Sequence, residues 1–332
     1  MDTQILDINE TSISIASKLI HQGQIVAFPT ETVYGLGADT FNEQAVSKIF
    51  LAKGRPSDNP LIVHISDNSM LELIAQEISS DARILFDTYM PSSLTVVLKK
   101  KSTVPDIVTA GLDTVAIRMP RSSQARIFIN ACNTPIAAPS ANTSGRPSPT
   151  DADAVYQDMQ GKIPLILRGD KCAVGIESTV ISLVDKPIIL RPGIVTQTEL
   201  ESLLNKRVDI YSPADGKLVN SPGVRFAHYR PSCATALFIT RNTDEVIKYI
   251  NSIVADRVCV ICKQELVDKF GHVDTISLGI DDYEASRNYF GAIRQAEANH
   301  DYIVQVFYPE QEVGQSLLNR MTKSAYGNIY KE

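Results

Sequence analysis

The most informative part of the chain for the fold and the site is the stretch Ile25-Val26-Ala27-Phe28-Pro29-Thr30-Glu31-Thr32-Val33-Tyr34-Gly35-Leu36-Gly37. Four apolar residues typical of a buried strand run into a polar segment with hydroxyls at Thr30, Thr32 and Tyr34 and a carboxylate at Glu31. The two glycines that follow would let backbone N–H groups approach a ligand closely. The pattern predicts a strand that ends in a ligand-binding loop, and a plain strand-to-helix connection is the simpler alternative.

The composition is that of a globular protein. The chain has 332 residues, 44% hydrophobic and 21% charged, which is long enough for two domains that each bury a core. No apolar run approaches the roughly 20 residues that cross a bilayer, and Met1-Asp2-Thr3-Gln4 is acidic where a leader peptide would be basic. We therefore expect a cytoplasmic protein without membrane contact.

The cysteines are not expected to carry chemistry. The five are scattered, which argues against a disulfide framework. Cys259 and Cys262 fall in a β-branched run that is typical of a buried strand, so we interpret them as small core residues and not as a redox or zinc pair.

The charge balance argues against a nucleic-acid grip. The net charge is −6, with 19 basic and 23 acidic residues up to Ile210 and 13 and 15 after it. Tight binding of tRNA would normally require a basic excess on one domain. Only 99–101 forms a short basic run, and a solvated strand end explains it most simply. We expect no tight direct tRNA binding.

The first two hundred residues alternate apolar runs with helical patterns. The expected strands are 25–28, 61–65, 94–98, 115–119, 165–168, 179–183 and 188–190, and the expected helices 43–52 and 122–131. This predicts a mixed α/β domain over 1–205. Within strand 61–65, His64 should share one face with Ile62, and the other three residues should point to the opposite face.

Periodicity then disappears and returns. Residues 206–232 are rich in Pro, Gly and Ser and are interpreted as an interdomain linker. After it, strands at 235–240, 258–262, 273–278 and 302–308 alternate with helical segments at 243–255, 265–270, 283–299 and 313–326. This predicts a smaller, parallel, Rossmann-like domain over 233–332. No Gly-x-Gly-x-x-Gly follows its first strand, so no dinucleotide site is expected.

Several polar clusters suit phosphate or carboxylate recognition. The helix stop Lys53-Gly54-Arg55 places two cations near Asn59, which would suit phosphate oxygens, although a dipole-paired helix end explains it too. His64 in a strand is more often a satisfied core residue than a ligand-binding one. Arg118 at a strand end fits either a salt bridge or a carboxylate clamp. The segments 137–150, 175–180 and 191–193 are also dense in small and polar residues.

Taken in order, these motifs resemble the threonylcarbamoyl-AMP synthase family. They are P-T-E-T-V-Y-G-L-G, K-G-R-P with N-P-L and H, A-I-R-M-P, A-P-S-A-N-x-S-G, G-x-E-S-T-V and L-R-P-G, across about 24–195. The linker's S-P-G and H-Y-x-P and the second domain are similar to the long form of the family. The resemblance implies a YrdC-like catalytic domain with a mixed, twisted α/β sheet, followed by the Rossmann-like domain.

The resemblance also implies a reaction. L-threonine, bicarbonate or CO2, and ATP would give threonylcarbamoyl-AMP and pyrophosphate, with Mg²⁺ arriving on the ATP and no tightly bound organic cofactor. A separate tRNA threonylcarbamoyl transferase would then modify the adenosine next to the anticodon. Such a condensation needs positioning and charge neutralisation more than a nucleophilic side chain.

Site residues follow from motif matching, and the roles remain those the resemblance implies. Lys53 and Arg55 would offset phosphate charge in catalysis. L-threonine would be bound by Thr32, His64, Arg118, Ala138 and Ser178. ATP would be bound by Arg55, Asn59, Thr114, Ser140, Asn142, Ser148, Arg191, His228 and Tyr229. The linker, through His228 and Tyr229, would close as a lid. No metal ligands are expected.

The chain departs from the family pattern at one turn, and two other functions stay open. Ser92-Ser93 stands where the family usually has Gly-Pro, and residues 224–227 alter the linker motif. The alternatives are an RNA-binding module and an enzyme that transfers a carbamoyl group from carbamoyl phosphate.

Overall fold

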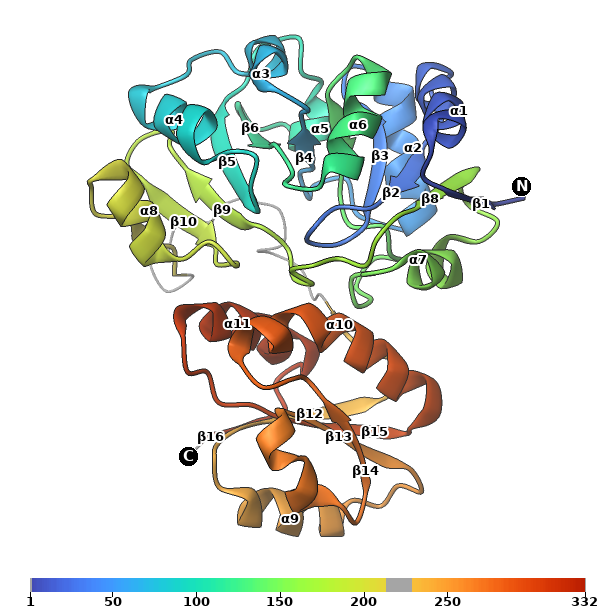
Figure 1. Cartoon of the computed structure of the whole chain (residues 1–332), viewed down its shortest axis with the longest axis vertical. Coiled ribbons are helices and arrows are strands. Elements are labelled where there is room, and N and C mark those ends of the chain that lie inside the picture. The colour runs from blue at the N-terminus through green and yellow to red at the C-terminus, as the bar shows by residue number, and fades with distance from the viewer. Residues whose placement is uncertain (1, 213–228, 332) are drawn as a thin grey trace. The chain divides into compact units, whose positions relative to one another are not determined.

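The computed structural model describes residues 2–212 and 229–331, which form two compact units (Figure 1). Of these residues, the first unit contains 2–144, 149–173 and 177–212, and the second contains 145–148, 174–176 and 229–331. The proposed domain limits at 205/206 and 232/233 remain a prediction, and most of the expected linker lies outside the described residues.

The strands described in the first unit form a single mixed sheet of eleven, in the order β1-β8-β2-β3-β7-β4-β6-β5-β9-β10-β11. Parallel and antiparallel pairs alternate irregularly along it, as the prediction of a mixed α/β domain requires. The bounds are β1 Gln4–Asp7, β2 Val26–Phe28, β3 Gly35–Asp39, β4 Ile62–His64, β5 Leu94–Lys99, β6 Thr114–Arg118, β7 Ile136–Ala138, β8 Leu165–Arg168, β9 Thr179–Ser182, β10 Ile188–Arg191 and β11 Asp209–Ile210. β11 lies within the segment interpreted as linker and pairs with β10.

The helices of this unit are short and mostly capped by their own sequence. They are α1 Glu10–His21, α2 Glu43–Lys53, α3 Asn68–Ile74, α4 Ser80–Ile84 with the π-helix η1 Leu85–Tyr89, α5 Asp106–Thr109, α6 Ser123–Cys132, α7 Ala152–Met159 and α8 Gln197–Leu204. Asn42 caps the start of α2, and Gly54 ends it at a φ of 61°, a backbone conformation that favours glycine. The helix stop predicted at Gly54 is therefore confirmed.

The two faces of the sheet are buried differently. Val63 and its neighbours Leu61 and Ile65 belong to the large core of the unit. Ile62 lies on the opposite face, in a small separate apolar cluster with Ala116 from β6. The predicted alternation along this strand is confirmed, and it puts His64 on the face of the small cluster.

The prediction of a loop throughout 29–37 is wrong in its last part. Residues from Gly35 onward form β3, which pairs antiparallel with β2 through Phe28 and Gly35. A Cβ on Gly37 would lie 2.6 Å from Ile136 and 2.9 Å from the Phe28 ring. These glycines therefore make room for the Phe28 ring, and the ligand-approach role first expected for them is not needed to explain them.

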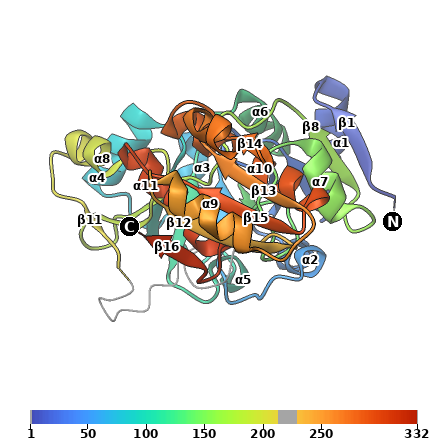
Figure 2. The same ribbon diagram turned by 90° about the horizontal axis from the view of Figure 1, so that it is seen from below.

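The second unit has a five-stranded parallel sheet in the order β14-β13-β15-β12-β16 (Figure 2). The predicted Rossmann-like sheet is confirmed. Its elements are β12 Ala234–Ile239, α9 Thr243–Ser252, β13 Val258–Cys262, η3 Gln264–Phe270, β14 Asp274–Ser277, α10 Asp282–Asn299, β15 Tyr302–Val306, α11 Glu312–Ser324 and β16 Ile329–Lys331. The segment predicted to be helical at 265–270 is a 3₁₀-helix, Gln264–Phe270.

The prediction that Cys259 and Cys262 are core residues of a buried strand is confirmed. Cys259 and Cys262 lie buried in β13, and both thiols are free. Burial raises the pKa of each to about 12, so neither is a thiolate at neutral pH.

Candidate active site

A buried ion pair joins the polar loop after β2 to the end of β6. Arg118 Nη2 lies 2.6 Å from Glu31 Oε1, and the two side chains are 4% and 5% exposed. Arg118 Nη1 donates to Thr32 Oγ1 at 2.8 Å, and Thr32 Oγ1 lies 2.9 Å from Thr30 Oγ1. Of the two sequence interpretations of Arg118, the salt bridge is present, and the guanidinium Nε has no hydrogen-bond partner among the described residues.

Glu31 stays ionised in this setting. Desolvation is the largest influence and would raise its pKa, but the charge and hydrogen bond of Arg118 together bring the pKa below its ordinary value. Ser93 Oγ donates to Oε1 at 2.9 Å and the Ser122 N–H to Oε2 at 3.2 Å. The carboxylate is thus fixed by three groups from three different segments.

His64 lies beside this pair. In the parallel pairing of β4 with β6, His64 is the register partner of Arg118, so the two side chains share a face of the sheet. The ring is buried, with Nδ1 3.1 Å from the Ile62 carbonyl oxygen, and it meets the Phe28 ring edge to face at 5.9 Å. Burial, assisted by the Arg118 charge, lowers its pKa to about 3, so the imidazole is neutral at physiological pH.

Two other residues matched to threonine, Ala138 and Ser178, lie at the ends of strands of this sheet. Ala138 ends β7 and is the register partner of Ile62. Ser178 precedes β9, where its hydroxyl lies 2.7 Å from Thr95 Oγ1. Arg191, one of the residues matched to ATP, donates from Nε to the Ser178 carbonyl at 3.0 Å and from Nη2 to Ser178 Oγ at 3.2 Å.

A second buried cation lies at the end of α2. Lys53 is 1% exposed, and its Nζ donates to the carbonyl oxygens of Ser140 and Asn142, both at 2.5 Å. Desolvation, followed by the charge of Arg55, lowers the pKa of Lys53 well below its ordinary value. Two segments predicted to bind ATP, the end of α2 and the loop after β7, are therefore brought together by hydrogen bonds within the protein, in which Lys53 uses two of its three donors.

The other residues matched to ATP vary in setting. Arg55 donates to the carbonyl oxygens of Asn59 and Pro60, each at 3.2 Å, and so closes its own loop. Thr114 opens β6 and is half-buried. In the second unit, Ser148 is buried and the Tyr229 ring packs at 5.1 Å from Phe290. His228 lies outside the described residues.

Three contributors were not expected from the sequence. Glu31 was noticed only as part of a polar loop, and its pairing with Arg118 spans 87 positions. Thr95 was assigned only to a strand. Ser93 was noted as a departure from the family pattern, and that departure was the available signal, because a serine hydroxyl donates to Glu31 where a proline could not.

The described residues contain no group of three or more His, Cys, Asp or Glu side chains placed to hold a metal ion. They also contain no helix that is both long and apolar enough to cross a membrane. The contacts described above make the first unit a mixed α/β sheet domain with two buried cations. Arg118 is balanced by the carboxylate of Glu31, and Lys53 is held by the carbonyl oxygens of Ser140 and Asn142.

Two family models together match most of the chain. The model described as telomere recombination matches residues 18–193, and this match places the first unit in the family that the model describes. The model described as threonylcarbamoyl-AMP synthase, C-terminal domain, matches residues 195–326. The chain belongs to the threonylcarbamoyl-AMP synthase family, as the sequence resemblance predicted.

Relatives with that name are similar over nearly the whole chain. The threonylcarbamoyl-AMP synthase of Pyrococcus abyssi is 40% identical, with 98% of this chain and 97% of that protein covered. That of Bacillus subtilis is 38% identical, with 99% and 97% covered. The crystal structure of P. abyssi Sua5 complexed with L-threonine is 39% identical and matches with a TM-score of 0.91 over 100% of this chain and 99% of that one.

Proposed function

We propose that this chain condenses L-threonine, bicarbonate or CO2, and ATP into threonylcarbamoyl-AMP and releases pyrophosphate. The observation that carries the proposal is the near full-length match to enzymes of that name, one of which was solved with L-threonine. The buried polar groups of the first unit support it, because they offer separate places for a zwitterion and for a polyphosphate.

L-threonine would lie on the Arg118 side. The guanidinium has a hydrogen-bonding nitrogen left over and would hold the threonine carboxylate, with Thr32, Ala138 and Ser178 shaping the rest of the pocket. Because His64 is neutral, it would offer the substrate a hydrogen bond without adding a second positive charge. A neutral ring also avoids repelling the substrate's ammonium group.

ATP would lie on the Lys53 side, with Arg55, Asn59, Ser140 and Asn142. Thr114, Ser148 and Arg191 are matched to ATP by sequence motif alone. Lys53 and Arg55 would neutralise charge on the phosphate oxygens, and Lys53 keeps one N–H donor for this purpose. Mg²⁺ would come with the nucleotide, coordinated mainly by phosphate oxygens and water.

The chemistry then needs no side-chain nucleophile. The deprotonated threonine amine adds to CO2 and forms a carbamate, and the proton lost from the nitrogen goes to solvent. A carbamate oxygen attacks the α-phosphorus of ATP as the bond to pyrophosphate breaks on the opposite side. The residues hold the two reactants in line and balance their charge. The linker residues His228 and Tyr229 would exclude water from the mixed anhydride, and a separate transferase would use the product for tRNA modification.

The test is pyrophosphate release from ATP, measured with and without L-threonine and bicarbonate, with the product identified by mass spectrometry. We expect release to depend on both. Arg118→Lys should raise the KM for threonine, and Arg168→Lys, which changes an exposed pair with Asp153, is the matched control. Carbamoyl-AMP formed from carbamoyl phosphate and ATP without threonine would favour carbamoyl transfer, and salt-sensitive RNA binding without ATP would favour a binding module.

A further inference from the structure

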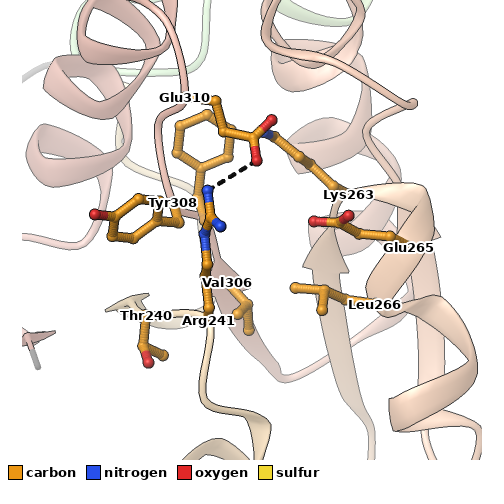
Figure 3. A pocket seen from close by; sticks show the side chains of 9 residues that line it. Thr240, Arg241, Lys263, Glu265, Leu266, Val306, Tyr308 and Glu310 are labelled. Atoms are coloured by element: carbon orange, nitrogen blue, oxygen red, sulfur yellow. Dashed lines mark hydrogen bonds and ion pairs between the residues drawn. The ribbon is translucent and has the colours of Figure 1, made fainter.

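We propose that the second unit binds a small amino-acid-like zwitterion in a cavity at the carboxyl edge of its parallel sheet. The cavity measures about 280 Å³ and is lined by residues that follow β12, β13 and β15. Its polar walls are Thr240 and Arg241, Lys263 and Glu265, and Tyr308 and Glu310 (Figure 3).

The topology of the sheet favours a ligand at this place. β12 and β15 are neighbours, but the chain leaves β12 through α9 toward β13 and leaves β15 through α11 toward β16. Figure 1 shows α9 on one side of this sheet and α11 on the other. Two adjacent parallel strands whose connections diverge leave a crevice at their carboxyl ends, which is where open α/β sheets bind ligands.

A carboxylate of the protein already marks an anion position in the cavity. Glu310 Oε1 lies 2.9 Å from Arg241 Nη2, and its Oε2 lies 3.2 Å from Lys263 Nζ. The side chains of Arg241 and Glu310 are 63% and 44% exposed, so their pairing contributes little to stability. Lys263 is buried but keeps its pair with Asp282 when Glu310 moves, so the carboxylate of a ligand can displace Glu310 at small cost.

The two cations are held ready for that ligand. The Arg241 guanidinium lies 4.7 Å from the centre of the Tyr308 ring. Lys263 is buried and lies 2.7 Å from Asp282 Oδ1, and the other oxygen of Asp282 accepts the N–H groups of Glu310 and Gln311 at 2.8 Å. The Lys263–Asp282 pair thus fixes the segment that forms the cavity wall.

Charge decides between ligand classes. With Glu310 displaced, Arg241 and Lys263 face two carboxylates, those of Asp282 and Glu265. Glu265 makes no ion pair with any described residue, and Figure 3 shows its carboxylate directed into the cavity. A ligand carboxylate would bridge the two cations and a ligand ammonium would meet Glu265, whereas a polyphosphate would face two negative groups. The cavity is also smaller than the roughly 300–1,000 Å³ of sites for drug-sized ligands.

The sequence contains no tryptophan, so the fluorescence of one introduced tryptophan would report on its own surroundings alone. Tyr308→Trp in the full chain places a single tryptophan on the wall of this cavity, among residues that have no assigned part in the synthase reaction. The probes are the proteinogenic L-amino acids, inorganic phosphate and AMP. For the amino acid that binds best, two analogues are added: the amine that lacks its carboxylate and the acid that lacks its ammonium group. We expect saturable fluorescence changes with one or a few amino acids and weaker ones with the single-charge analogues. Because the signal is local, its failure would be distinguishable from failure of the synthase proposal.

Four further variants sharpen the test. In the reporter background, Arg241→Gln should weaken binding at least tenfold, and Arg257→Gln should leave it unchanged, because Arg257 forms an equally exposed pair with Asp301 outside the cavity. Glu310→Gln should strengthen binding about two- to fivefold, since it removes the competing carboxylate. Leu266→Trp serves as a second reporter if Tyr308→Trp fails to fold.

The proposal is overturned if no amino acid changes the fluorescence of either folded reporter. It is equally overturned if Arg241→Gln binds as well as the control, if Glu310→Gln has no effect, or if phosphate or AMP binds better than every amino acid.

Discussion

Replacement of Glu31 by glutamine should destabilise the first unit by about 3 kcal/mol, because it leaves the Arg118 charge buried without a counter-charge. Breaking a buried ion pair by removing one partner costs about 3–5 kcal/mol. Glutamine keeps an oxygen that can accept from Arg118 and from Ser93, which places the expected value at the lower end. The loss is large against a typical total stability of about 5–15 kcal/mol.

The assay is urea unfolding followed by circular dichroism, with Glu77→Gln as the control. Glu77 is also paired with a cation, but its carboxylate lies 3.9 Å from Lys99 Nζ and the side chains are 70% and 47% exposed. Its loss should cost less than about 1 kcal/mol. If the two units unfold in separate transitions, only the one belonging to the first unit should move for Glu31→Gln.

The difference in free energy of unfolding between the wild type and Glu31→Gln should depend on pH in a fixed direction. The pKa of Glu31 in the folded protein is lowered, so its contribution is complete above the ordinary glutamate value of about 4.3 and is lost as the pH falls through the folded value. The gap between the wild type and Glu31→Gln should therefore narrow in acid. A cost no greater than that of the Glu77 control at neutral pH would refute the reasoning.

Four other substitutions test separate parts of the structure. Lys53→Met should reduce threonine-dependent pyrophosphate release about a hundredfold or more, and a loss below tenfold would count against its role beside the phosphates. Gly37→Ala should lower the free energy of unfolding by about 1–3 kcal/mol, whereas Gly271→Ala, with no atom nearer than 3.8 Å to its new Cβ, should not; equal effects would contradict the packing argument. Ser93→Ala removes one hydrogen bond to Glu31 and should cost about 1 kcal/mol in the same urea assay, so an unchanged midpoint would show that the bond is not needed. The pKa of His64 lies at about 3 in the folded protein and near 6.5 when unfolded, so its stabilisation is present above pH 6.5 and lost toward pH 3; His64→Gln should therefore lose less stability than the wild type between pH 7 and 4, and an identical loss would argue against a buried neutral ring.

The parts of the fold that could be predicted are those whose secondary structure is determined by the local sequence pattern. The α2 helix has an apolar periodicity and ends at Gly54, and the strands of the second unit are β-branched runs separated by helical patterns. β3 could not be predicted this way, because Gly-Leu-Gly-Ala-Asp is a poor strand sequence. It becomes a strand because Phe28 packs across its glycines, and such a contact between segments is invisible in a local pattern.

In the site, too, local sequence predicted some features, and others depend on contacts between distant segments. Motifs identified the polar residues, since Arg118, Lys53 and Ser178 each lie in a recognisable segment. What they could not give was the partner of each charge. The pairing of Arg118 with Glu31 depends on how the loop after β2 crosses the end of β6, and the tie from Lys53 to the Ser140 carbonyl depends on where the loop after β7 meets the end of α2. Backbone carbonyls in particular have no sequence signature, because every residue has one.

The way each buried cation is neutralised supports the assignment of substrates to the two sides of the site. Arg118 has a full counter-charge in Glu31, so a ligand there meets a neutral pair, which suits a zwitterion such as threonine. Lys53 forms no ion pair within the described residues and is held by the carbonyl oxygens of Ser140 and Asn142, so its cost of burial is only partly offset. Burial and the nearby Arg55 lower the pKa of Lys53, and a polyphosphate bound beside both cations would raise that pKa again. Binding of ATP and recovery of the Lys53 charge would therefore reinforce each other, whereas the same polyphosphate placed at Arg118 would have to compete with Glu31.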